Sequence, residues 1–301
     1  MLVFFIEHYE SLATELAGLA NVPLGTVARN LFPDGEHYLR VADEVNDQDV
    51  VLVGGTCDHD ATLELYDLAC AIVECGASTL TLIVPYFGYS TMERAVKRGE
   101  AVMAKNRARM LSSIPRAKLG NRIVLLDLHS EGIPHYFEGT IRPFHVYAKP
   151  LIVQLARELA GERFILGSTD AGRAKWVESL ANDLGVPAAF VFKRRISGQQ
   201  TEVTAVSTSL SGETVVIYDD MIRTGSSLLN AARAYREAGA GKMIAIATHA
   251  VFPGDALERI QASGMFEAIG VTNSHRNAEG LEEKGVVVRS VAGLFLPFVR
   301  R

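Results

Sequence analysis

The residues best suited to chemistry lie between positions 214 and 240, where an apolar run meets two acids and a turn of small residues. The run TVVIY leads directly into Asp219 and Asp220. The turn precedes a segment of helical period and consists of Thr224, Gly225, Ser226 and Ser227. Amides and hydroxyls at a helix N-terminus converge on one point at the positive end of the helix dipole, which favours a phosphate dianion. The two carboxylates are placed to accept hydrogen bonds from sugar hydroxyls, and Gly225 lets the backbone approach closely.

Each part of this pattern also has an ordinary structural explanation. Ser and Thr are frequent N-caps, and acids at strand ends often lie in solvent. The turn alone would favour the N-cap explanation. Two acids that end a buried strand shortly before such a turn are much more specific, and we therefore predict a binding site for a sugar phosphate.

A turn near the N-terminus could bind a purine base. It carries Phe32, whose ring could stack on the base, and Asp34 and Glu36, whose carboxylates could accept hydrogen bonds from an amino group. The alternative is an ordinary Pro-Asp-Gly turn beside a core phenylalanine.

Two strand ends carry side chains that could bind a metal ion. In LLDLHS (125–130), His129 follows an apolar run and Asp127, which suits a magnesium ion in contact with a polyphosphate. Because magnesium prefers oxygen ligands, a half-buried structural histidine is the alternative. In GSTDAGRAKW (167–176), Asp170 ends another strand and opens a helix, where it could bind metal, act as an N-cap, or do both.

Three cations follow the strand predicted at 188–192, namely Lys193, Arg194 and Arg195. Such a group usually forms a solvated face. Transfer of a phosphoryl group, however, depends on positioning and on cations at the charge that develops in the transition state. A loop that carries Lys and Arg could supply these charges and could exclude water when it closes.

The elements that must position these residues alternate between short runs rich in Val and Ile and longer amphipathic stretches. This alternation predicts an α/β fold with mainly parallel sheets flanked by helices. We predict strands at 50–54, 80–84, 123–126, 164–167, 188–192, 214–218, 243–247 and 267–271. We predict helices near 61–75, 149–160, 173–184, 227–238 and 255–263.

Residues 50–87 and 213–250 share one plan of strand, loop, helix, Gly-Ala and strand. The Gly-Ala pair at 76 aligns with the pair at 239 without a gap, at an offset of 239 − 76 = 163. A chain of 301 residues also exceeds the usual size of one core. We therefore predict two similar domains, 1–147 and 148–301. One large sheet with a chance match is the alternative.

The composition limits the classes of partner. A net charge of −5 argues against a general nucleic-acid binder, which needs Lys and Arg to neutralise phosphates. We expect neither a signal peptide nor a membrane helix, because the N-terminus lacks a basic region and no long uncharged run follows. Cys57, Cys70 and Cys75 form no CxxC pair and are odd in number, which suits reduced thiols in the cytoplasm.

The loop at 215–230 resembles the phosphoribosyl-pyrophosphate-binding motif of type I phosphoribosyltransferases and of ribose-phosphate pyrophosphokinases. The resemblance implies that Asp219 and Asp220 hold the ribose hydroxyls and that the turn at 224–227 holds the 5-phosphate. It also implies that both domains have a type I phosphoribosyltransferase-like fold.

Four segments resemble the pyrophosphokinases, at 32–36, 125–130, 167–176 and 193–195. The first implies that the nucleotide binds at Phe32, Asp34 and Glu36. The pyrophosphokinases often use this segment at a neighbouring subunit, so the resemblance implies a homo-oligomer.

The other three segments imply the metal and the catalytic groups. The resemblance places Mg²⁺ at His129 and Asp170, with His129 also at the triphosphate. It assigns catalytic roles to Lys193 and Arg195, and transferases of the same fold carry no such cations there.

Residues 85–115 resemble the same family over their whole length. Most members have an Arg-Gln pair where this chain has Thr91-Met92, and the plant-type class II enzymes also lack that pair. The run at 91–94 and the later THAVFP (248–253) resemble class II. This resemblance implies that Arg94 contacts the polyphosphate and that the choice of nucleotide is relaxed.

The whole resemblance implies an enzyme that transfers the diphosphate group of ATP, or of another nucleoside triphosphate, to the C1 hydroxyl of ribose 5-phosphate. The products would be phosphoribosyl pyrophosphate and a nucleoside monophosphate. Three alternatives stay open: a type I phosphoribosyltransferase, a non-catalytic regulatory homologue, and a pyrophosphokinase with another donor or acceptor.

Overall fold

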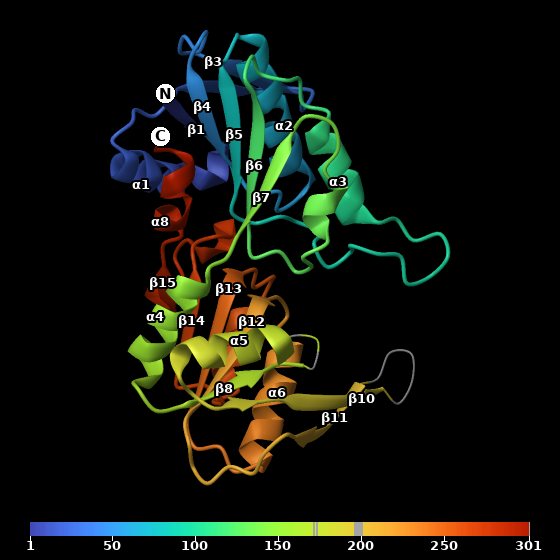
Figure 1. The fold of residues 1–301 in the computed structure, drawn as a ribbon, viewed down its shortest axis with the longest axis vertical. Helices are drawn as coiled ribbons and strands as arrows, with labels where there is room; N and C mark the ends of the chain where they lie inside the picture. Colours follow the sequence, from blue (N-terminus) through green and yellow to red (C-terminus); the bar gives the residue numbers. More distant parts are fainter. Residues whose placement is uncertain (171, 173, 196–200, 301) are drawn as a thin grey trace. The chain divides into compact units, whose positions relative to one another are not determined.

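The computed structural model describes residues 1–170, 172, 174–195 and 201–300, without the side chains of 193–195 and 201–205. The chain divides into two compact units. The first unit comprises Met1–Tyr147, Ser274–Arg276 and Ser290–Arg301. The second unit comprises Ala148–Asn273 and Asn277–Arg289. Each unit holds a parallel sheet flanked by helices, which confirms the predicted fold class (Figure 1).

The sheet of the first unit has five parallel strands in the order β1-β4-β5-β6-β7. Most of its strands are Val-, Ile- and Leu-rich runs with buried side chains, as expected for a parallel sheet. They are β1 (Leu2–Phe5), β4 (Asp49–Val53), β5 (Thr79–Val84), β6 (Gly120–Leu126) and β7 (Arg142–Val146). An antiparallel hairpin of β2 (Val27–Leu31) and β3 (His37–Val41) precedes β4.

Four α-helices of the first unit surround this sheet, among the residues that the structure describes. They are α1 (Glu10–Ala20), α2 (His59–Glu74), α3 (Met103–Ser112) and α8 (Ala292–Phe295). Helix α2 packs on β4 and β5 through a buried apolar stripe that includes Leu65, Leu68 and Ile72. It begins where the carboxylate of Asp58 accepts a hydrogen bond of 2.9 Å from the amide of Ala61. Short 3-10 turns lie at Glu7–Tyr9, Ile133–Tyr136 and Leu296–Phe298.

The sheet of the second unit has six parallel strands in the order β15-β14-β13-β12-β8-β9. The strands are β8 (Ile165–Ser168), β9 (Ala188–Ala189), β12 (Val215–Ile222), β13 (Met243–Ala250), β14 (Ala268–Thr272) and β15 (Val287–Arg289). The helices are α4 (Lys149–Ala160), α5 (Ala174–Leu184), α6 (Ser226–Glu237) and α7 (Ala256–Ala262), with 3-10 turns at Arg276–Ala278 and Glu282–Lys284. A separate antiparallel hairpin consists of β10 (Val191–Arg195) and β11 (Thr201–Val206).

The repeat predicted from the sequence is a real structural repeat. In the first unit it is β4-α2-β5, and in the second it is β12-α6-β13, with parallel neighbouring strands in both. Gly76 and Gly239 follow the two helices with φ of +93° and +100°. A side chain is strained in that conformation, and a Cβ on Gly239 would also lie 2.2 Å from the carbonyl oxygen of Leu210.

Two predicted strand ends were wrong. β12 continues through Asp219 and Asp220 to Ile222, because its last residues still pair with β13. The strand predicted at 188–192 is two strands, and the backbone of Lys193 and Arg195 belongs to β10, not to a loop after it.

The sequence predicted only β4, β5, β6 and α2 of the first unit, and the missed elements include two without a clear sequence pattern. Strand β7 (RPFHV) has no fully buried side chain, and α3 (MAKNRARMLS) buries only Ala104, Ala108 and Leu111. Packing against neighbouring elements therefore stabilises them more than an obvious apolar period does.

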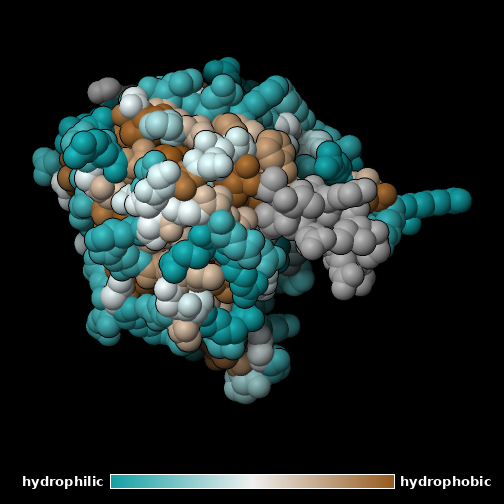
Figure 2. Space-filling view, turned by 90° about the horizontal axis from the view of Figure 1, so that it is seen from below, coloured by the Kyte–Doolittle hydropathy of each residue, from teal (hydrophilic) through white to brown (hydrophobic). Residues whose placement is uncertain are grey.

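On the face that Figure 2 shows, hydrophilic side chains separate smaller apolar areas. In the described part of the chain, no helix combines the length and the apolar character needed to cross a membrane. Cys57, Cys70 and Cys75 are free thiols.

Tyr235 connects α6 to β8, the strand that precedes Thr169 and Asp170. The side chain is fully buried, and its single hydroxyl proton is shared between the carbonyl oxygens of Ser168 (3.1 Å) and Ala189 (2.9 Å). Burial raises the pKa of Tyr235 well above its usual value, so the hydroxyl stays protonated as the donor.

We predict that Tyr235→Phe lowers the free energy of unfolding by about 1–3 kcal/mol, because two buried carbonyls lose their donor. Trp176 is the only tryptophan in the sequence and stacks on Tyr218 at 4.1 Å, so its fluorescence in urea reports the second unit. Asn230→Ala, which removes an exposed hydrogen bond on the same helix, should change stability by no more than about 0.5 kcal/mol. Equal stability of Tyr235→Phe and the wild type would contradict the prediction.

Candidate active-site regions of the two units

The order of the second sheet creates a switch point between β8 and β12. After β8 the chain adds β9 on one side, and it then returns to add β12 on the other side. Ligands of open α/β sheets bind outside the carboxyl ends of the strands at such a point, because the two connections leave in opposite directions. The residues predicted to bind the sugar phosphate lie at this edge of the sheet.

Two hydrogen bonds hold the carboxylate of Asp219 at this edge. β8 pairs with β12 only as far as Tyr218, so the β8 side of the next residues is not covered by the sheet ladder. The hydroxyl of Thr169, just after β8, donates a hydrogen bond of 2.9 Å to Asp219 Oδ2. The amide of Asp220 donates to Asp219 Oδ1 at 3.0 Å, and the side chain of Asp220 is buried. The structure therefore brings together Asp219, Asp220 and the segment around Asp170.

The predicted phosphate turn has the expected relation to a helix. Gly225 is the N-cap of α6 with φ of +77°, and a Cβ there would lie 2.6 Å from Ile260 Cδ1. The Thr224 and Ser226 hydroxyls lie 3.3 Å apart and are exposed together with Ser227. The amide of Leu229 is the first to bond back to Gly225, so the amides before it are not used within the helix. These groups can bind an anion.

Sequence reasoning missed a contact that supports this turn. Arg259 on α7 donates a hydrogen bond of 3.1 Å to the carbonyl oxygen of Thr224 and lies 3.2 Å from Asp255. No local motif marks Arg259, because it follows the turn by more than thirty residues.

Asp170 is half-buried in the second unit. Its Oδ1 accepts a hydrogen bond of 2.9 Å from the amide of Gly172, so the carboxylate closes a tight turn after β8. Asp170 thus closes a local turn before α5, and its metal role stays a prediction.

The first unit also gathers polar groups at the carboxyl ends of its strands. The hydroxyl of Thr56, after β4, accepts a hydrogen bond of 2.7 Å from the amide of Gly88, after β5. The amide of Thr56 donates to the carbonyl oxygen of Tyr86 at 2.9 Å. A Cβ on Gly88 would lie 1.9 Å from the Thr56 carbonyl oxygen, so the two loops can approach this closely only with glycine there.

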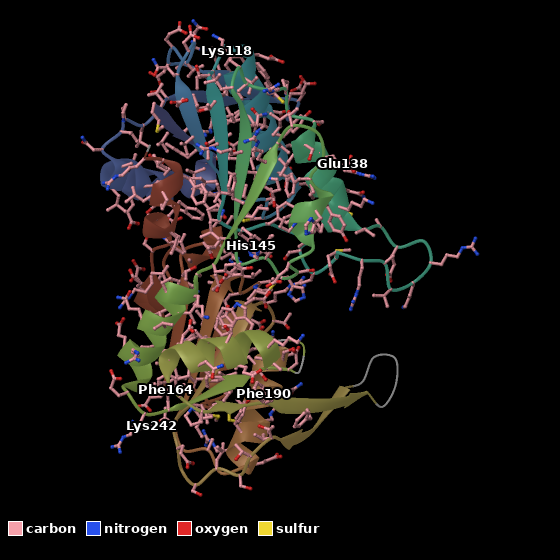
Figure 3. The ribbon with its side chains drawn as sticks, in the orientation of Figure 1. Lys118, Glu138, His145, Phe164, Phe190 and Lys242 are labelled. Atoms are coloured by element: carbon pink, nitrogen blue, oxygen red, sulfur yellow. The ribbon has the colours of Figure 1, made fainter. Side chains whose placement is uncertain are left out.

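His129 follows β6 in the same unit and is half-buried. The segment before it is positioned by His145 of β7, labelled in Figure 3. Nε2 of His145 accepts a hydrogen bond of 3.0 Å from the amide of Leu128. Burial lowers the pKa of His145, although the carboxylates of Asp127 and Glu131 act in the opposite direction. A neutral imidazole is what this acceptor role requires, and no sequence motif had marked this histidine.

The predicted purine segment is the tip of the hairpin β2–β3. Phe32 is 43% exposed, and its ring meets Tyr38 edge-on at 6.2 Å. The carboxylate of Asp34 accepts a hydrogen bond of 3.2 Å from the amide of Glu36. The core position considered for Phe32 was therefore wrong, and its ring is accessible to a ligand.

Arg94 lies in the loop between β5 and α3. Its side chain is 80% exposed, and its nearest carboxylate is that of Glu93 at 3.5 Å. A hydroxyl from Tyr136 donates to the carbonyl oxygen of Glu93 at 2.6 Å, which ties the loop to the body of the unit.

The predicted catalytic and metal-binding residues are the remaining part of the site. The side chains of Lys193 and Arg195 lie outside the described part of the chain. His129 belongs to the first unit and Asp170 to the second. Among the described residues, no group of three or more His, Cys, Asp or Glu side chains forms a metal site.

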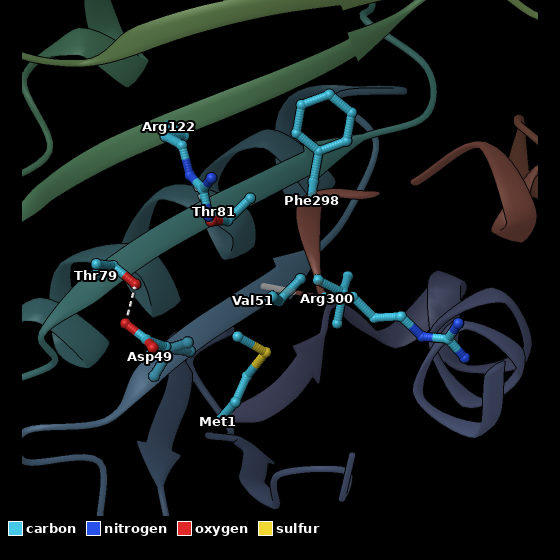
Figure 4. Close-up of a pocket in the computed structure, with 10 residues that line it drawn as sticks. Met1, Asp49, Val51, Thr79, Thr81, Arg122, Phe298 and Arg300 are labelled. Carbon is cyan, nitrogen blue, oxygen red and sulfur yellow. Dashed lines mark hydrogen bonds between the residues drawn. The ribbon is translucent and has the colours of Figure 1, made fainter. Parts of the chain in front are cut away.

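A pocket of about 250 Å³ opens on the first unit away from these residues (Figure 4). Its polar groups are paired with one another, since Thr79 donates to Asp49 at 2.6 Å and Arg122 donates to Thr81 at 3.0 Å. None of the site residues predicted from the sequence lines this pocket.

Family models match both units. Residues 1–114 match the N-terminal domain of ribose phosphate pyrophosphokinase, and residues 174–283 match the phosphoribosyl synthetase-associated domain. The chain is 33% identical over 288 residues to the ribose-phosphate pyrophosphokinase of Synechococcus elongatus, a match that covers 94% of this chain and 85% of the relative. It is 31% identical to that of Burkholderia pseudomallei, with coverage of 98% and 92%.

A solved structure leads to the same group of proteins. The crystal structure of phosphoribosylpyrophosphate synthetase from Mycobacterium smegmatis matches with a TM-score of 0.86 and 27% identity, over 99% of this chain and 97% of that one. Similarity over nearly the whole length, in sequence and in fold, assigns the protein. The chain belongs to the ribose-phosphate pyrophosphokinase family.

Proposed function

We propose that this chain is a ribose-phosphate diphosphokinase that transfers the diphosphate group of ATP to the C1 hydroxyl of ribose 5-phosphate. Membership of the family over nearly the full length supports this activity. The observation that carries the proposal is the order of strand, two acids, small-residue turn and helix at the switch point of the second sheet.

The acceptor binds in the second unit. The turn at 224–227 holds the 5-phosphate with the first amides of α6 and with its hydroxyls, at the positive end of the helix dipole. Asp219 and Asp220 hold the ribose hydroxyls. The hydrogen bond from Thr169 fixes one oxygen of Asp219 before the sugar arrives, which reduces the cost of ordering the site.

The donor binds in the first unit. Exposure of the Phe32 ring at a hairpin tip supports stacking on a purine, and Asp34 and Glu36 stand beside it. His129 and Arg94 contact the polyphosphate. Leu31 (60% exposed) and Tyr38 lengthen the apolar surface of the hairpin, which supports its insertion into a neighbouring subunit of a homo-oligomer.

In the reaction, the C1 oxygen of ribose 5-phosphate attacks the β-phosphorus of ATP in line with the bond to the α-phosphate oxygen. The O1–Pβ bond forms, the bridge to the α-phosphate breaks, and the hydroxyl proton is lost. The products are phosphoribosyl pyrophosphate and AMP. Lys193 and Arg195 stabilise the charge that develops on the transferred group, because catalysis of phosphoryl transfer is mainly electrostatic.

Membership of the family supports a magnesium ion as the cofactor. His129 and Asp170 would hold it, and substrate phosphates and waters complete the oxygen ligands that magnesium prefers. When bound, Mg²⁺ neutralises phosphate charge and orients the polyphosphate. Few protein ligands are needed for such an ion, because phosphates and waters supply the rest.

The enzyme belongs to the plant-type class II branch. The run Thr91-Met92-Glu93-Arg94 and the segment THAVFP support this assignment, together with the lack of Arg-Gln at 91–92. Relaxed choice among nucleoside triphosphates follows from it.

The decisive assay incubates the protein with Mg²⁺, ribose 5-phosphate and each nucleoside triphosphate in turn, and then identifies the products. We predict phosphoribosyl pyrophosphate and the matching nucleoside monophosphate in equal amounts. Release of pyrophosphate that depends on an added base would identify a phosphoribosyltransferase, and no turnover of any donor would support the regulatory homologue.

In the same assay, Lys193→Ala and Arg195→Ala should lower kcat by roughly 100-fold or more, as loss of an electrostatic stabiliser does. The KM values should change much less, because these charges act mainly in the transition state. Near-normal kcat in both variants would remove them from the mechanism.

A charge placed in the phosphate turn tests the acceptor site. Ser226→Asp should weaken ribose 5-phosphate binding by at least roughly tenfold through like-charge repulsion. It should not destabilise α6, because an acid at a helix N-terminus is favourable. Titration calorimetry measures the affinity, and Asn182→Asp, an exposed position on α5, is the control of equal charge. Unchanged affinity in folded Ser226→Asp would place the phosphate elsewhere.

Two variants separate the phosphate contact from the base contact in the donor site. Arg94→Ala should raise KM by roughly tenfold for every triphosphate, because the lost contact is to phosphate. Phe32→Ala should change the ranking among the bases. Arg116→Ala, exposed in the same unit, is the control. Normal kinetics of Arg94→Ala with every donor would exclude it from the triphosphate site.

A further inference from the structure

Arg107 on α3 has an environment unlike that of the arginines of the first unit that form ion pairs. Its guanidinium carbon lies 5.1 Å from the centroid of the Tyr89 ring. Its Nε is buried and has no hydrogen-bond partner in the described part of the chain. A buried donor without an acceptor is costly, and more so when it carries a positive charge.

Other arginines of the first unit show the usual arrangement. Arg109, half a turn away on the same helix, pairs with Glu138 at 2.9 Å. Arg29 pairs with Glu64 at 2.8 Å. The ion pairs found among the described residues do not include Arg107. The Tyr89 ring satisfies the face of its guanidinium, but a ring face leaves the N–H groups at the edge without an acceptor.

Tyr89 places this cation at the carboxyl edge of the first sheet. The residue follows β5 and adopts φ of +60°. Its hydroxyl lies 3.0 Å from Nε2 of His59, which follows β4, and the two rings stack at 5.9 Å. β5 lies between β4 and β6, and His129 follows β6. His59, Tyr89 and Arg107 therefore form a row at the edge where the donor is proposed to bind.

Backbone hydrogen bonds place one face of α3 beside residues 89–92, a segment that carries no cation. The amide of Met92 donates to the carbonyl oxygen of Tyr89 at 2.8 Å, and the amide of Ala104 donates to that of Met92 at 3.3 Å. Ala104 and Arg107 are three residues apart on α3 and share one face of the helix. Arg107 thus faces residues 89–92, where Thr91 and Met92 provide no charge.

We propose that Arg107 is a substrate-binding residue whose guanidinium grips the polyphosphate chain of the nucleoside triphosphate, oriented by the Tyr89 ring. A guanidinium matches phosphate oxygens with paired N–H groups, and the terminal N–H groups of Arg107, in contrast to the buried Nε, are the ones that a phosphate can reach. Arg107 is already held against a ring, whereas Arg94 is 80% exposed and must be ordered on binding. This inference rests on the proposed function, since it assigns a further contact to the same donor site.

The test uses the full enzyme and two probes, Mg²⁺-ATP and inorganic tripolyphosphate as a competitor of ATP. Arg107→Gln should raise KM for ATP and the inhibition constant of tripolyphosphate by a similar factor, roughly 10-fold to 150-fold for a lost charge-assisted contact. The ranking of ATP against GTP and the KM for ribose 5-phosphate should stay unchanged. Arg109→Gln removes an equal charge from the same helix and should leave both constants near the wild-type values.

A purely structural role for Arg107 predicts a different result. Loss of the stack would then disturb Tyr89 and alter the ranking of the bases, with unequal effects on ATP and tripolyphosphate, and that outcome would overturn the proposal. Normal constants in Arg107→Gln would overturn it as well. If this variant does not fold, Arg107→Lys, which keeps the charge without the planar fork, should show a smaller increase in both constants, and no increase would reject the contact. A wild-type enzyme that makes no phosphoribosyl pyrophosphate would reject the proposed function itself, before Arg107 is tested.

Discussion

The hydrogen bond between Thr169 and Asp219 joins the ends of the two strands on which the proposed acceptor site depends. These residues lie 50 positions apart in the chain and meet only because β8 and β12 are parallel neighbours. β12 extends past the end of its pairing with β8, so its acids stand at the switch point with one strand edge not covered by the ladder. The bond holds the side chain of Asp219 on the side where β8 no longer pairs with β12, while β13 still pairs with the other side. The strand order thus leaves one edge of β12 unpaired after Tyr218 and places Thr169 beside it.

The same principle recurs in the first unit with different chemistry. Thr56 and Gly88 bond across the ends of β4 and β5, and His145 supports the segment before His129 from β7. One α/β plan therefore presents two sets of polar loops, each at the carboxyl edge of a parallel sheet. The fold provides the edge, and the loop residues decide which ligand binds there.

Local charge, not net charge, must bind the anionic substrates of this family. The chain carries a net charge of −5, so its long-range field does not favour phosphates. The helix dipole of α6 acts only within its first turn, and Arg107, the proposed contact to the polyphosphate, is held against the Tyr89 ring. Short-range groups held in place by packing therefore replace a general positive field.

The sequence by itself determined the features that depend on neighbouring residues. Periodic apolar runs predicted the α/β fold. The Gly-Ala repeat predicted a shared plan of strand, helix and strand, because glycine readily ends a helix with positive φ, as Gly76 and Gly239 do. The order of strand, acids, turn and helix around Gly225 is also local, so the residues alone are enough to recognise it. The match of motifs pointed to the family for the same reason.

Only the tertiary structure decided the contacts between distant segments. The pairs Tyr89–Arg107, Leu128–His145 and Thr224–Arg259 join residues of different elements, and no spacing rule connects their positions. Strand ends were missed where pairing with a neighbour extends a strand beyond its apolar run, as in β12. The physical reason is that a side chain's partner is set by the packing of strands and helices, which the order of residues specifies only through the complete fold.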